Sequence, residues 1–74
     1  MSKLHLEILI QDDLSPTMST YFDGLQLQPV EGNACQLTGD VSDYSALYGV
    51  LERIRDLNLH LVSAQVNPIL PKGT

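Results

Sequence analysis

The sequence contains a single cysteine, Cys35, in 74 residues. One cysteine cannot form an internal disulfide, so the chain differs from the disulfide-stapled small domains of secreted proteins and fits a reducing compartment. A chain of this length buries only about 60% of its unfolded surface on folding, which makes a lone core marginal. The lack of a disulfide therefore favours stabilisation by association with another chain.

Basic residues are also scarce, with four Lys and Arg against nine Asp and Glu and a formal net charge of −5. The cations, Lys3, Arg53, Arg55 and Lys72, are scattered along the chain. Proteins that bind nucleic acid or anionic membrane surfaces present clustered Lys and Arg. We therefore expect neither nucleic acid nor membrane among the partners.

Long apolar runs are absent as well. No segment approaches the roughly 20 consecutive apolar residues of a membrane-spanning helix, and the N-terminus lacks the apolar stretch of a secretory signal. We therefore expect a cytoplasmic protein. It is predicted to have one α/β domain over residues 1–67 and a flexible C-terminal tail over 68–74, where two prolines and a glycine occur.

Alternation of apolar and polar residues predicts a half-buried strand over residues 3–10. Further strands are predicted over 25–28, 34–41 and 59–66. Pro29 follows the second strand and indicates a sheet edge, because proline cannot donate to a strand ladder. The last strand is interpreted as apolar on both faces, which a sheet covered on only one side would not need.

Two helices are predicted between these strands. Ser15 and Pro16 are typical of an N-cap and a first helical position and predict a short helix over 15–22. Ser42 is the predicted N-cap of a longer helix that ends at Asn58, a residue that tolerates the left-handed conformation. The order βαββαβ is typical of the ferredoxin-like fold. This predicts an α+β two-layer sandwich with antiparallel sheet order 4-1-3-2 and both helices on one face.

The second half of the chain carries a distinctive pattern, L-T-G-D-V-S-D-Y-S-A-L-Y-G-V-L-E-R-I-R-D-L-N-L-H-L-V-S-A, over residues 37–64. It resembles an uncharacterised group of small bacterial proteins in which a strand ending in L-T-G leads into a helix of the form A-L-x-G-L-L-x-R-I-R-D-L. Asn58 stands where glycine is common in that group. The resemblance implies a small intracellular protein and supports the second βαβ half, but it implies no activity.

Few side chains suggest chemistry. His5 and His60 open the first and last strands, so as antiparallel neighbours they are expected roughly 15 Å apart, too far for a shared metal. Cys35 lies on the predicted core face and is interpreted as a buried, inert thiol. Asp12 and Asp43 flank helix starts, where capping and solvation explain them. We therefore predict no catalytic, cofactor-binding or metal-binding residues and a protein that is not an enzyme.

Gly49 interrupts the long helix at a cost of about 1 kcal/mol relative to alanine. With Leu47 at the centre of the buried stripe, Gly49 lies about 200° away, on the outer back of the helix. One interpretation is tolerance of glycine at an exposed position. The other is close approach of a second backbone, such as the helix of another subunit, bordered by Tyr48 and Arg53.

The polar face of the predicted sheet is a second candidate surface, because two copies could pack through it or join along the last strand. We interpret the chain as a small protein-interaction or regulatory module that acts as a homodimer. An ACT-like effector-binding domain, by analogy of fold, and a small enzyme with an intersubunit site are the alternatives. The predicted interaction residues are Tyr48, Gly49, Arg53, His5, Glu7, Gln26 and Gln36.

Overall fold

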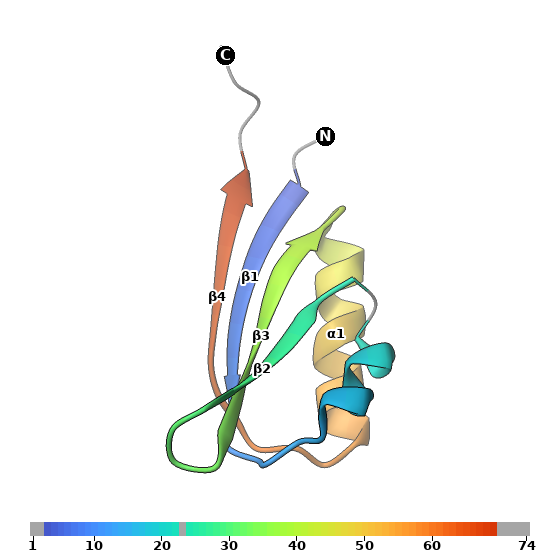
Figure 1. Ribbon diagram of the computed structural model, residues 1–74. Coiled ribbons are helices and arrows are strands. Elements are labelled where there is room, and N and C mark those ends of the chain that lie inside the picture. The colour runs from blue at the N-terminus through green and yellow to red at the C-terminus, as the bar shows by residue number, and fades with distance from the viewer. Residues whose placement is uncertain (1–2, 23, 70–74) are drawn as a thin grey trace.

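The computed structural model describes residues 3–22 and 24–69, which form a four-stranded antiparallel sheet with helical segments on one face (Figure 1). The sheet order is β2-β3-β1-β4, so β2 and β4 are its two edges. In chain order the elements are β1 (Lys3–Ile10), η1 (Pro16–Tyr21), β2 (Gln26–Val30), β3 (Ala34–Val41), α1 (Tyr44–Asp56) and β4 (Leu61–Ile69).

The predicted ferredoxin-like sandwich is wrong, because the described residues contain one α-helix instead of two. Over residues 3–22 and 24–69 the fold is α+β, with four antiparallel strands and a single α-helix. Read from β4, the neighbours run 4-1-3-2. The predicted fold class is wrong because the helical layer has one α-helix, α1, and lacks the α-helix predicted over 15–22. The ACT-like alternative loses the analogy on which it rested.

The segment predicted as the first helix, 15–22, contains the short 3-10 helix η1. Ser15 caps it as expected, since its hydroxyl oxygen accepts a hydrogen bond from the backbone N–H of Thr17. The Phe22 N–H then donates to the Ser19 carbonyl, three residues back. Six residues rising about 2.0 Å each give a length of roughly 12 Å, so η1 covers only part of the sheet.

The core lies between β1, β3 and α1. Alternate residues of β1 are buried, as their spacing predicts, and β3 beside it in the sheet buries a second row. Helix α1 and Phe22 also contribute to the core cluster. Burying one such Leu or Ile side chain stabilises the fold by about 1.5–3 kcal/mol. The buried residues of these three elements are Leu4, Leu6, Ile8, Ile10, Ala34, Cys35, Leu37, Val41, Leu47, Val50 and Ile54.

Helix α1 begins one residue later than predicted. Asp43, not Ser42, is the N-cap, and its carboxylate accepts a hydrogen bond of 2.9 Å from the Ala46 N–H. At the other end Asn58 has a positive φ of 58°, as predicted. The Leu59 N–H donates to the Ile54 carbonyl at 3.0 Å and so satisfies one of the last free carbonyls of the helix.

Strand β4 begins and ends later than predicted. Pro68 and Ile69, which the sequence assigned to the tail, lie in β4. The rest of the predicted tail, 70–74, lies outside the described residues. Ala64 stands opposite the buried Ile8 and therefore shares the core-side face of the sheet.

The polar residues Ser63, Gln65 and Asn67 occupy the other face of β4, opposite Leu9, Glu7 and His5. Only one face of β4 is therefore apolar, contrary to the prediction of two apolar faces.

The helical layer leaves β4 uncovered. Helix α1 packs on β3 and η1 on β2, whereas β4 lies at the opposite edge of the sheet and makes no extensive contact with either helical segment (Figure 1). As a result Ala64 is exposed and Val66 half-buried, although both face the core side. We call the surface made by Leu61, Val62, Ala64 and Val66 the β4 flank.

Candidate functional site

The structure divides the seven predicted interaction residues among three places. Gly49 and Arg53 line a cleft beside α1. Tyr48 projects from a different side of the helix and is 61% exposed. The other four, His5, Glu7, Gln26 and Gln36, belong to the open face of the sheet.

The cleft lies between η1 and α1 and has a volume of about 220 Å³. An added Cβ at Gly49 would meet no heavy atom within 4 Å, so the position faces open space and no close backbone contact within the chain requires glycine. Gly49 is half-buried at the wall of this cleft, a surrounding that the predicted outer-back position did not reveal. The cleft residues are Tyr21, Phe22, Val41, Ala46, Gly49, Val50 and Arg53.

The floor of the cleft is apolar and its mouth is polar. Phe22, Val41 and Val50 are buried, whereas Tyr21 and Arg53 are exposed. A guanidinium and a phenol at the mouth can hold a polar group beside an apolar one. The cleft therefore has the size and chemistry for one apolar side chain of a binding partner.

Tyr44 and Tyr48 lie on the opposite side of α1 from the cleft, because 3.6 residues make one turn. The cleft side of α1 faces η1, which packs on β2, so the two tyrosines lie on the side nearer to β4. Both rings are more than half exposed. They are exposed apolar surface on α1, and tyrosine is enriched at protein interfaces.

On the open face, His5 lies between two carboxylates. Its Nδ1 is 2.8 Å from an oxygen of Asp40, and its Nε2 is 3.8 Å from an oxygen of Glu7. All three side chains reach solvent. The described residues contain no group of three or more His, Cys, Asp or Glu side chains arranged to hold a metal ion.

A shallow hollow of about 280 Å³ occupies the centre of the open face and draws residues from all four strands. Glu7 and Gln36 line it, and the neighbouring Gln26 stands opposite Thr38 at the β2 edge. Four of the six lining residues carry an amide, hydroxyl or carboxylate group, which suits hydrogen bonding to a partner surface. The lining residues are Glu7, Leu9, Val30, Gln36, Ser63 and Gln65.

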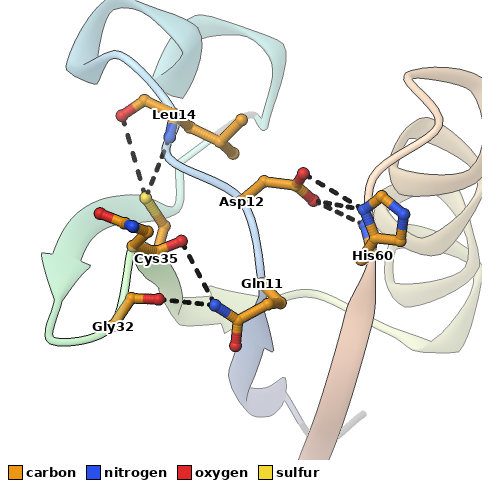
Figure 2. Close-up of polar contacts among 7 residues, drawn as sticks. Gln11, Asp12, Leu14, Gly32, Cys35 and His60 are labelled. Carbon is orange, nitrogen blue, oxygen red and sulfur yellow. Dashed lines mark hydrogen bonds and ion pairs between the residues drawn. The ribbon is translucent and has the colours of Figure 1, made fainter.

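Figure 2 shows how the loop after β1 is fastened to the start of β4. The carboxylate of Asp12 accepts a 2.7 Å hydrogen bond from the His60 backbone N–H and approaches His60 Nδ1 at 3.2 Å. The backbone hydrogen bond from His60 is the main cause that lowers the pKa of Asp12. His60 thus lies at the opposite end of the β1–β4 pair from His5, as predicted.

Cys35 is buried on the core face, as predicted. The Leu14 N–H donates to its Sγ at 3.4 Å, and the thiol lies 3.8 Å from the Leu14 carbonyl oxygen (Figure 2). Nearby, the side-chain amide of Gln11 donates to the Gly32 carbonyl at 2.6 Å. These contacts hold the loop between β1 and η1 against the β2–β3 turn.

The list of predicted interaction residues omitted the exposed apolar residues Leu61 and Val62 at the start of β4, although the last strand was interpreted as apolar on both faces, and it omitted Tyr44 on α1. A signal was present, since the nine residues of β4, L-V-S-A-Q-V-N-P-I, include no charged side chain. A long uncharged strand at a sheet edge is unusual, because natural edges normally carry charges or bulges that prevent pairing.

A family model described as "Domain of unknown function (DUF8691)" matches residues 5–65. The chain belongs to the DUF8691 family. The matched span includes most of β1, all of η1, β2, β3 and α1 of this DUF8691 chain, and the first part of β4. Searches of the curated proteins and of the solved structures found no significant match. Among the described residues, no helix has the length and hydropathy to cross a membrane.

Proposed function

We propose that this DUF8691 chain is a small cytoplasmic protein-interaction module that acts as a homodimer. The observation that carries the proposal is the uncovered β4 flank. Residues on the core-side face of β4 stay exposed because α1 and η1 cover the other half of the sheet. An exposed apolar surface of this kind is typical of an interface, and Tyr44 and Tyr48 on α1 are further exposed apolar side chains.

The energetics support association. Leu61 and Val62 are 47% and 53% exposed. Complete burial of such a side chain stabilises by about 1.5–3 kcal/mol, so covering the exposed half contributes roughly 1 kcal/mol for each. Tyr44 and Tyr48 add larger areas. The sum is a useful fraction of the 5–15 kcal/mol that stabilises a typical domain, and it is available only to a chain with a partner.

The cytoplasmic part of the proposal rests on cysteine chemistry. Cys35 is a free, buried thiol, and the chain holds no second cysteine with which it could pair. A small domain that gains stability from association has less need of a disulfide. This composition suits a reducing compartment.

The test is the oligomeric state in solution, measured by sedimentation over a wide concentration range. Val62→Asp places a charge in the β4 flank, and Val30→Asp places the same charge on the exposed apolar residue of β2. We expect a wild-type dimer, a monomeric Val62→Asp variant and a dimeric Val30→Asp variant, all with unchanged circular dichroism. A wild-type chain that is monomeric at every concentration contradicts the proposed function.

A further inference from the structure

The two edges of the sheet differ in their protection against pairing. β2 has five residues, includes Pro29 and is followed directly by Glu31. A short edge strand with a proline and an adjacent charge is poorly suited to accept another strand. β2 is therefore an edge that is protected against pairing with another strand, and we call it the closed edge.

β4 has none of these protections along most of its length. It has nine residues without a charged side chain, and its register irregularity lies near its start, between the partners of Leu9 and Ile10. Pro68, its one proline, is the second residue from the end. Along its outer side the backbone N–H and C=O groups have no partner strand among the described residues. Such an edge is a template for strand addition.

The net charge of the chain restricts where a second copy can bind, and the uncharged β4 edge is one surface that permits it. Two copies, each with a net charge of −5, repel one another wherever their acidic surfaces meet. The uncharged β4 allows close approach without placing like charges opposite each other. A two-fold interface also requires one surface that is complementary to itself.

β4 is self-complementary about its central residue, Gln65. When the strand is reversed against itself there, Ser63 meets Asn67, and Leu61, which lies beyond the register irregularity, comes to the end of the strand that carries Ile69. In the alternate positions Val62 meets Pro68 and Ala64 meets Val66. Every pair joins apolar with apolar or polar with polar. Because side chains alternate between faces, an axis that falls between two residues would instead oppose the polar and apolar faces.

We propose that β4 pairs antiparallel with β4 of a second copy, around a two-fold axis at Gln65. The product is one continuous sheet of eight strands, four from each copy. This proposal rests on the proposed function, because it specifies the surface that forms the homodimer. It also places the Tyr44 and Tyr48 sides of both α1 helices toward the shared centre on one face of the sheet.

Single cysteine substitutions test this geometry. Residues opposite each other in antiparallel strands have Cα atoms about 4.5–5.5 Å apart, within the range that a disulfide bridges. In Gln65→Cys each new thiol faces its own copy, so mild oxidation is expected to double the mass under non-reducing conditions. Gln28→Cys is the matched control, because Gln28 is an exposed glutamine on the same sheet face in the other edge strand. Cys35 is buried in both variants.

A second arm tests the register. Two copies of Ser63→Cys are offset by four residues, about 13 Å, and are expected to stay reduced. An equal mixture of Ser63→Cys and Asn67→Cys is expected to form the mixed disulfide. Cross-linking of Ser63→Cys alone, or of Gln28→Cys as readily as Gln65→Cys, overturns the proposal.

The two proposals fail in different ways. A wild-type chain that sediments as a dimer while Gln65→Cys stays uncross-linked overturns the β4 pairing and leaves the homodimer intact. A monomeric wild-type chain overturns both.

Discussion

Replacing Gly49 with alanine is expected to stabilise the protein. Gly49 lies in the middle of α1, and its φ is not among the positive values found at Gly24, Gly32 and Gly39. A methyl group at this position would meet no heavy atom within 4 Å. The substitution therefore introduces no clash and no backbone strain.

The size of the effect is set by helix propensity. Glycine in a helix interior is about 1 kcal/mol less favourable than alanine, because it loses more backbone freedom on folding. For a domain of 60–100 residues, 1 kcal/mol shifts the Tm by about 4–8 °C. We expect Gly49→Ala to raise the Tm by this amount and to raise the free energy of unfolding by about 1 kcal/mol.

The assay is thermal and urea denaturation measured by circular dichroism, with Gly39→Ala as the matched control. An added Cβ at Gly39 would lie 2.7 Å from Leu25 Cδ2 and 3.3 Å from the Gly24 carbonyl oxygen, at a φ of 157°. Overpacking of this kind costs about 1–3 kcal/mol. The same chemical change is thus expected to stabilise at one glycine and destabilise at the other.

An unchanged or lower Tm for Gly49→Ala would refute the reasoning, because it would mean that the space beside Gly49 is occupied in solution. A loss that appears at high protein concentration and vanishes on dilution would identify the occupant as a second copy of the chain. That result would support the close-approach interpretation of the glycine.

Three further predictions concern a helix cap, a loop carboxylate and a buried thiol. Asp43→Ala should lower the free energy of unfolding, measured by urea denaturation, by about 1 kcal/mol, because Asp43 is the N-cap. Ser42→Ala should leave the free energy of unfolding nearly unchanged. Equal losses in the two variants would contradict the assignment of Asp43 as the N-cap. The His60 N–H lowers the pKa of Asp12, so this carboxylate contributes stability above its ordinary pKa of 3.8 and loses it as the pH falls through the lower folded value. The stability deficit of Asp12→Asn at neutral pH should therefore shrink in acid, and a constant deficit in urea titrations would contradict the linkage. The buried thiol of Cys35 should react with a thiol reagent only after unfolding; rapid labelling of the folded protein would oppose this.

The strands could be predicted from the sequence because each signal lies within a few residues. Apolar and polar side chains alternate from Lys3 to Ile10, and the structure has a strand with those bounds. Asn58 was assigned the left-handed conformation from its residue type alone, and it has a φ of 58°. Local steric preferences decide features of this kind.

The helical layer could not be predicted in the same way. Ser15 and Pro16 mark a helix start correctly, but a start signal determines neither the length nor the type of the helix. The next residues, Thr17, Ser19 and Thr20, are weak helix formers, and the segment ends after six residues as a 3-10 helix. The α-helix predicted over 15–22, and with it the fold class, depended on a helix propensity that these residues do not supply.

The candidate site was predicted in part. Helical periodicity placed Gly49 away from the buried stripe, but it gave no information about η1, which is distant in sequence and forms the other wall of the cleft. The exposure of β4 could not be predicted from the sequence for the same reason. Residue parity shows which side chains share a face, whereas only the packed structure shows that α1 lies over the other half of the sheet.

The closed edge at β2 has a consequence for the size of any assembly. Strand-by-strand growth into a fibre needs two free edges on each molecule, one for each neighbour. Pro29 and Glu31 obstruct one of them. A molecule that can extend its sheet in a single direction stops growing after one addition, so this chain can carry an uncharged strand on its surface without polymerising.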